Sequence, residues 1–133
     1  EKELPGPARL HLQLDRVESF SVTLSNAAGE KWVAGFDADS NYFFIDRAQS
    51  GIKNFEKGFS SRVTSKRINT ARSLELTLVI DNASAELFAD GGLTTMSSIF
   101  FPKENYKSIS IRGNQKFSIQ KASLIPLESI WGN

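Results

Sequence analysis

The sequence predicts an all-β fold in which two antiparallel sheets pack face to face as a β-sandwich. Short segments in which apolar and polar residues alternate recur along the chain, and turn residues such as Ser25-Asn26 and Gly91-Gly92 separate them. The sequence shows no strand–helix alternation, which disfavours a parallel sheet crossed by helices. We therefore expect about nine to twelve short strands and no substantial helix.

Length and composition fit one folded domain, since the chain has 133 residues, of which 40% are hydrophobic and 23% charged. The formal net charge is +1, so neither nucleic acid nor an anionic membrane is an expected partner. No apolar run approaches the roughly 20 residues of a membrane-spanning helix. The absence of cysteine excludes disulfides, thiol catalysis and zinc–thiolate sites.

The domain is expected to occupy residues 8–133 and to follow a linker remnant at residues 1–7. The first segment contains two prolines and a glycine, which favour an extended linker over a regular element. The chain begins at Glu1 with neither a signal peptide nor an initiating methionine. We therefore interpret it as a piece of a longer protein.

The first strand is expected at residues 8–14, where leucines at every second position define a buried face. His11, the only histidine, then lies on the polar face, and a surface imidazole explains it better than a catalytic or metal-binding role. Two further strands are expected at residues 20–24 and 31–36, on the same alternation.

Residues 41–47 are apolar on both alternating faces, which indicates a strand that is either central in a sheet or covered by a neighbouring domain. Residues 48–72 are expected to form a loop with about one helical turn, because Gly51 and Gly58 bracket too few residues for a stable helix. This loop is basic. A solvated surface is favoured over a phosphate or nucleic-acid site, since no aromatic pattern accompanies the charges.

Residues 74–102 are expected to form a meander of three strands. Leucine and isoleucine alternate with other residues from Leu74 to Ile80, which is the period of a strand with one buried face. Asp81-Asn82 and Gly91-Gly92 supply the two turns, and Pro102 stops the third strand.

The last third of the chain is expected to add strands at residues 106–112 and 116–124, with a hairpin turn at Gly113-Asn114 between them. The apolar end contains Pro126, which lacks a backbone donor. We expect it to be an edge strand or a strap docked on the body of the domain.

The residues assign no catalytic site. Glu75 and Glu86 lie on neighbouring strands of the meander, but a glycosidase needs two carboxyl groups that face each other across a cleft. Two acids on the wet face of a sheet are better explained as solubilising residues.

The residues assign no metal site or cofactor either. Asp37 and Asp39 open a D-x-D-x-N pattern typical of a calcium loop, but Tyr42 and Ala48 replace the glycine and glutamate that such a loop needs. A polar turn is the better explanation, and calcium binding at Asp37 and Asp39 is left open.

The candidates for sugar binding are Trp32, Tyr42, Asp46 and Arg47. An aromatic ring can lie on the apolar face of a sugar, while carboxylate and guanidinium groups hold its hydroxyls. The alternative for Trp32 is a core position, which its alternation with apolar neighbours favours. Asp46 and Arg47 would in that case pair with backbone groups or with each other.

Two stretches resemble a known family. Residues 41–51, NYFFIDRAQSG, are similar to the D-R-x-x-S-G segment in the C-terminal β-sandwich of glycoside hydrolase family 32, which comprises invertases, levanases and inulinases. Residues 76–102 resemble the next signature of that domain, and residues 127–131 are similar to its terminus. The matching elements of the second stretch are Asp81, Glu86-Leu87-Phe88, Asp90-Gly91-Gly92 and Ser97-Ser98-Ile99-Phe100-Phe101-Pro102.

The resemblance implies a jelly-roll or concanavalin A lectin-like sandwich that is not catalytic by itself. In the family it resembles, catalysis belongs to a separate N-terminal five-bladed propeller with N-D-P, R-D-P and E-C motifs, none of which occurs in this sequence. The implied partner is such a propeller in the same protein, in an enzyme that cleaves fructan or sucrose.

Other functions remain as alternatives. One is a free-standing lectin-like module that binds fructan, and a self-sufficient hydrolase with surface carboxylates has less support. The resemblance implies a secreted, periplasmic or cell-surface bacterial protein, with a cytoplasmic location left open.

Overall fold

The computed structural model describes residues 2–4, 6–49, 62–100, 102, 104–113 and 121–127. Eleven strands and one 3-10 turn form in these residues. They are β1 (Lys2–Glu3), β2 (Ala8–Leu14), β3 (Phe20–Ser25), β4 (Lys31–Asp37), β5 (Tyr42–Gln49), β6 (Arg62–Lys66), β7 (Leu74–Ile80), β8 (Ser84–Ala89), η1 (Asp90–Gly92), β9 (Thr94–Ile99), β10 (Ser108–Gly113) and β11 (Lys121–Pro126).

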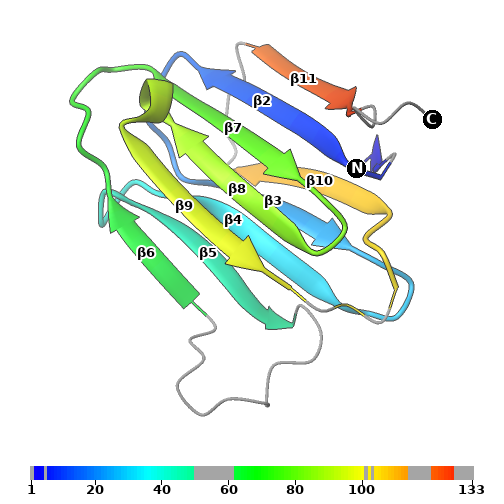
Figure 1. The fold of residues 1–133 in the computed structure, drawn as a ribbon. Coiled ribbons are helices and arrows are strands. Elements are labelled where there is room, and N and C mark those ends of the chain that lie inside the picture. The colour runs from blue at the N-terminus through cyan, green and yellow to red at the C-terminus, as the bar shows by residue number, and fades with distance from the viewer. Residues whose placement is uncertain are drawn as a thin grey trace.

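The strands form two stacked sheets (Figure 1). The six-stranded sheet has the order β1-β10-β3-β4-β5-β6, and the five-stranded sheet has the order β11-β2-β7-β8-β9. Every strand pair in the described residues is antiparallel. The predicted all-β sandwich is therefore confirmed, and β7, β8 and β9 lie side by side as the predicted meander. Among the described residues, no helix is long and apolar enough to cross a membrane.

The core lies between the sheets, because each strand turns every second side chain inward. In β2 and β7 the inward positions are all buried and the intervening ones are half-buried or exposed. The largest fully buried side chains are Trp32, Phe36, Phe43 and Phe100. The Trp32 and Phe100 rings meet edge to face with centroids 5.8 Å apart, and burial of such a side chain contributes about 1.5–3 kcal/mol.

The strand predicted to be apolar on both faces is β5, which lies between β4 and β6. Phe43 and Ile45 point into the core, whereas Tyr42 and Phe44 are half-buried on the outer face of the sheet. β5 is therefore an internal strand next to the edge strand β6, and its outer aromatic side chains are only partly covered.

The prediction of a loop throughout residues 48–72 is wrong for residues 48–49, which belong to β5, and for residues 62–66, which form the edge strand β6. Its side chains are mostly exposed, so the segment lacks the apolar alternation that reveals a strand in sequence. Backbone pairing with β5 holds it in the sheet, and the Arg62 guanidinium lies over the Phe44 ring at 4.3 Å from the centroid. The helical turn expected between Gly51 and Gly58 lies outside the described residues.

The predicted hairpin between the last two strands is also wrong. β10 pairs with β3 and β1, while β11 pairs with β2 in the other sheet, so the chain crosses between the sheets after Gly113. Both strands satisfy their hydrogen bonds with partners that are distant in sequence. β11 lies at the edge of its sheet and ends at Pro126, which confirms the predicted edge position. Residues 114–120 and 128–133 lie outside the described residues.

Part of the segment expected as a linker contacts the body of the domain. Lys2 and Glu3 form β1, which pairs with Ile109 and Ser108. The Leu4 backbone N–H donates to the Lys107 carbonyl at 2.7 Å, and the Leu4 side chain is buried. The start of the chain is thus an edge strand of the six-stranded sheet.

Candidate functional site

Trp32, the first predicted sugar-binding residue, is a core residue. Its side chain is fully buried, and its Nε1–H donates to the Ser98 hydroxyl on β9 at 3.2 Å. The indole therefore links the two sheets and presents no face to solvent. This is the alternative that the alternation of the sequence favoured.

The other three candidates do not converge either. Tyr42 and Asp46 both lie on the outer face of β5, but four residues of strand separate them by about 13 Å. Asp46 pairs with Arg62, with Nη1 and Oδ2 3.5 Å apart. Arg47 instead donates from Nη1 to the Ile99 carbonyl of β9, at 3.4 Å. The four predicted residues therefore have separate places: Trp32 lies in the core, Tyr42 and Asp46 lie on the outer face, and Arg47 contacts the other sheet.

Asp37 has the turn role that the sequence favoured. Its Oδ1 accepts the backbone N–H of Asp39 at 3.0 Å and that of Ser40 at 3.3 Å. Asn41 completes the connection between β4 and β5 in the left-handed region, with φ of 57°. Within the residues that the structure describes, no group of three or more His, Cys, Asp or Glu could hold a metal ion.

The two acids considered as a catalytic pair lie far apart. Glu86 is opposite Val79 in the β7–β8 register, and Glu75 lies four residues before Val79, which places their Cα atoms more than about 13 Å apart. The Glu75 carboxylate is held by His11 and the Gly91 backbone, at the end of β7 away from Glu86. Glu75 and Glu86 therefore do not face each other as the paired carboxyl groups of a glycosidase do.

Glu75 instead joins two elements of the five-stranded sheet. It accepts from His11 Nε2 on β2 at 3.1 Å and from the Gly91 backbone N–H in η1 at 3.0 Å. These hydrogen bonds, with the larger effect from His11, lower the pKa of Glu75 despite partial burial. His11 lies on the polar face as predicted. Its partner on β7, Glu75, could be identified only from the register of β2 and β7.

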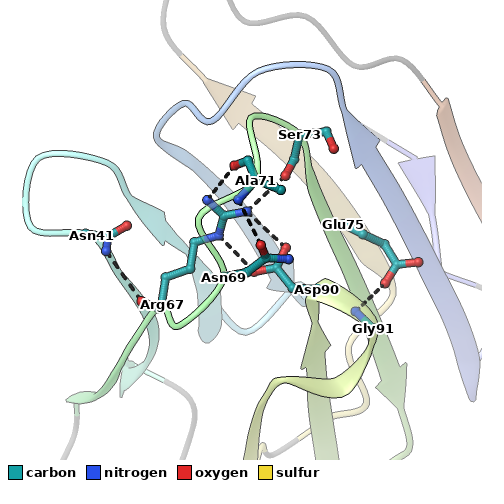
Figure 2. Close-up of polar contacts among 8 residues, drawn as sticks. All are labelled: Asn41, Arg67, Asn69, Ala71, Ser73, Glu75, Asp90 and Gly91. Atoms are coloured by element: carbon teal, nitrogen blue, oxygen red, sulfur yellow. Dashed lines mark hydrogen bonds and ion pairs between the residues drawn. The ribbon is translucent and has the colours of Figure 1, made fainter.

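The strongest polar cluster in the described residues centres on Arg67 and Asp90 (Figure 2). Arg67 Nε donates to Asp90 Oδ2 at 2.8 Å, and Nη2 donates to Oδ1 at 3.2 Å. The two side chains are only 4% and 2% exposed. Two further N–H groups of the guanidinium, one on Nη1 and one on Nη2, donate to the carbonyls of Ala71 and Ser73, at 3.2 and 2.9 Å.

This cluster, which we call the Arg67–Asp90 corner, ties the two sheets together at one end. Arg67 follows β6 of the six-stranded sheet, and its backbone N–H donates to the Asn41 carbonyl at 2.9 Å. Asp90 follows β8 of the five-stranded sheet and has φ of 54°, and Gly91 continues the left-handed turn with φ of 70°. The glycine supplies the tight turn that aims the carboxylate inward.

The Arg67–Asp90 corner was not predicted from the sequence. Arg67 belongs to the basic stretch interpreted as solvated surface, but its guanidinium is buried and makes four hydrogen bonds. Asp90 lies in the turn after β8, and its side chain points into the protein. A buried charge needs a partner, and the partner lies 23 residues away in sequence, beyond the reach of any local pattern.

The fold and these contacts define a class: a β-sandwich domain whose buried polar groups hold its two sheets together. The family model described as "Glycosyl hydrolases family 32 C terminal" matches residues 8–127, and the chain belongs to this family. The resemblance found in the sequence motifs is thus confirmed.

Named relatives agree with this membership. The chain is 24% identical over 113 residues to a levanase of Bacillus sp. (strain L7), covering 84% of this chain and 12% of that protein. It is 30% identical over 122 residues to the sucrose-6-phosphate hydrolase of Vibrio alginolyticus, covering 91% of this chain and 23% of that protein. The chain therefore spans less than a quarter of the length of these relatives.

Solved structures share the fold. The exo-inulinase of Aspergillus awamori superimposes with a TM-score of 0.85 at 20% identity, over 98% of this chain and 26% of that chain. The sucrose-6-phosphate hydrolase of Lactobacillus gasseri gives a TM-score of 0.76 at 23% identity, over 98% of this chain and 27% of that chain.

Proposed function

We propose that this chain is the non-catalytic C-terminal module of a glycoside hydrolase that acts on β-fructofuranosyl linkages. Its role is to stabilise and dock on an N-terminal five-bladed propeller that carries the catalytic site. Support comes from relatives named levanase and sucrose-6-phosphate hydrolase, of which the chain covers only 12% and 23%.

The proposal rests on what the acidic side chains do in and next to residues 76–102, the stretch that resembles the family. Asp81 Oδ1 accepts the Asn82 backbone N–H at 2.7 Å within a turn, and Asp90 is buried against Arg67. Glu75 binds His11 and Gly91 and does not face Glu86 as in a catalytic pair. Asp81, Asp90 and Glu75 thus hold turns and sheets in place.

The proposal includes the domain limits and the location. Residues 8–133 form the module, and residues 1–7 lead into it from the partner, with β1 as the first point of contact on the six-stranded sheet. We place the parent outside the cytoplasm of a bacterium, because relatives include Bacillus levanases and proteins named extracellular exo-inulinase.

The test has an activity arm and a docking arm. The purified chain should release no reducing sugar from levan, inulin or sucrose, and hydrolysis by the chain alone would refute the non-catalytic role. Mixed with the separately expressed region that precedes it in the parent protein, the chain should co-elute with that region and raise its Tm. The absence of both effects would refute docking. An unrelated β-sandwich domain of similar size is the control.

A further inference from the structure

The outer face of β3 is lined by small hydroxyl side chains. Phe20, Val22 and Leu24 point into the core, so the intervening Ser21, Thr23 and Ser25 face outward. A hollow of about 600 Å³ lies over them. Its lining comes from β3 and the strands on either side: Ser21, Thr23, Ser25, Lys31, Val33, Ser110, Ile111 and Arg112.

A second hollow continues from the first and shares Ser21 and Arg112 with it. It has a volume of about 440 Å³ and is also lined by Asp37, Phe44 and Arg62. Together the two hollows form one groove, which we call the β3 groove. Between Ser21 and Ser25 it extends about 13 Å along the strand.

β3 and β4 approach each other closely beside the groove. Gly35 lies opposite Ser21 in the register of the two strands and is buried. A Cβ at this position would lie 2.1 Å from the Phe20 carbonyl oxygen. Phe44 and Arg62 line the groove on its far side, with the guanidinium 4.3 Å from the ring centroid.

The lining suits a ligand with many hydroxyl groups. Serine and threonine hydroxyls both donate and accept, and on one strand face they repeat about every 6.7 Å. The exposed side chains of Lys31 and Arg112 add donors at the rims. Asp37 is occupied by its own turn, through two backbone N–H groups on Oδ1. Hydroxyl side chains outnumber the charged ones along the floor, which favours an uncharged polyol over an anion.

We propose that the β3 groove binds a chain of sugar residues, at a surface distinct from Trp32 and Arg47. The choice of fructan as the sugar rests on the proposed function. A fructan held here would tether the parent enzyme to its polymeric substrate without contributing to hydrolysis.

The test is a titration of the 133-residue chain with levan-type and inulin-type fructo-oligosaccharides, followed by NMR and calorimetry. Backbone amide shifts are expected at residues 21–25 and 110–112. Thr23→Tyr fills the groove and should abolish binding. Arg112→Ala should weaken it about tenfold, the expected effect of losing a hydrogen bond from a charged donor. The matched controls Thr77→Tyr and Arg9→Ala, on the outer face of the other sheet, should bind as the wild type does.

Absence of shifts, or shifts confined to other surfaces, would overturn the proposal. Wild-type affinity for the sugar in folded Thr23→Tyr or Arg112→Ala would also overturn the proposal. If Thr23→Tyr fails to fold, the affinity of Arg112→Ala alone decides the test. If a sulfated oligosaccharide bound and the uncharged ones did not, the inference of an uncharged ligand would be wrong. Co-elution with the catalytic partner is measured separately on the wild-type chain, so failure of sugar binding is distinguishable from failure of the proposed function.

Discussion

Arg67 and Asp90 form a bidentate ion pair that links the two sheets in a site almost closed to solvent, with side chains 4% and 2% exposed. The pair joins the end of β6 to the turn after β8 (Figure 2). Two carbonyls accept further hydrogen bonds from the guanidinium, which makes four in all. Such a pair is costly to break, because removal of one partner leaves the other charge buried alone.

Arg67→Ala should therefore lower the free energy of unfolding by about 3–5 kcal/mol, as measured by urea denaturation. Arg72→Ala, in the same basic stretch but exposed, should change it by less than about 0.5 kcal/mol. Equal effects of the two substitutions would show that the corner contributes nothing beyond an ordinary surface arginine.

Gly35→Ala should cost at least about 2 kcal/mol, because the new Cβ meets the Phe20 backbone carbonyl at 2.1 Å and the strands must separate. Gly29→Ala is the comparison, since its Cβ would meet no atom within 4 Å and only its φ of 82° opposes alanine. That substitution should cost about 1–2 kcal/mol. Thermal unfolding of the two variants measures the difference. A smaller loss for Gly35→Ala than for Gly29→Ala would contradict the close approach of β3 and β4.

The sequence predicted those parts of the fold that depend on local pattern. β2, β7 and the meander follow from alternation and turn residues, and the core position of Trp32 was favoured on the same ground. β6 was missed because an exposed edge strand carries no apolar period. The pairing of β11 with β2 was missed because strand order is set by contacts far apart in sequence.

The same limit applies to the candidate site. The sequence assembled Trp32, Tyr42, Asp46 and Arg47 because they are close along the chain, but strand geometry sends neighbouring side chains to opposite faces. The Arg67–Asp90 corner and the β3 groove both combine elements that only the sheet topology brings together. The chemical types of the residues could be read from the sequence, but which residues lie close together in space could not.

Ser98→Ala should destabilise the domain by about 1–3 kcal/mol, because it leaves the buried Trp32 indole N–H without its acceptor. Ser97→Ala, the exposed neighbour on β9, is the matched control and should change stability by less than about 0.5 kcal/mol. Urea denaturation of both variants provides the comparison. A Ser98→Ala variant as stable as Ser97→Ala would mean that the hydrogen bond between the sheets is unimportant.

Glu75 should make part of the stability dependent on pH. Hydrogen bonds from His11 and Gly91 lower its pKa in the folded state below the ordinary value of 4.5. Between the two pKa values the unfolded chain binds more protons than the folded one, so stability falls as the pH falls through that window. The contribution is complete above pH 4.5 and lost below the folded-state pKa. It should stay below about 1 kcal/mol, because the Glu75 side chain is 43% exposed.

The comparison that isolates this effect is wild type against Glu75→Gln, with Tm measured at several pH values between about 6 and 3. The wild type should be the more stable near pH 6, and its advantage should shrink as the solution becomes acid, because a protonated Glu75 and a glutamine are both uncharged. Ser97→Ala, which changes no titratable group, should differ from wild type by the same amount throughout. An advantage over Glu75→Gln that is constant or grows toward acid pH would rule out the lowered pKa of Glu75 as its source.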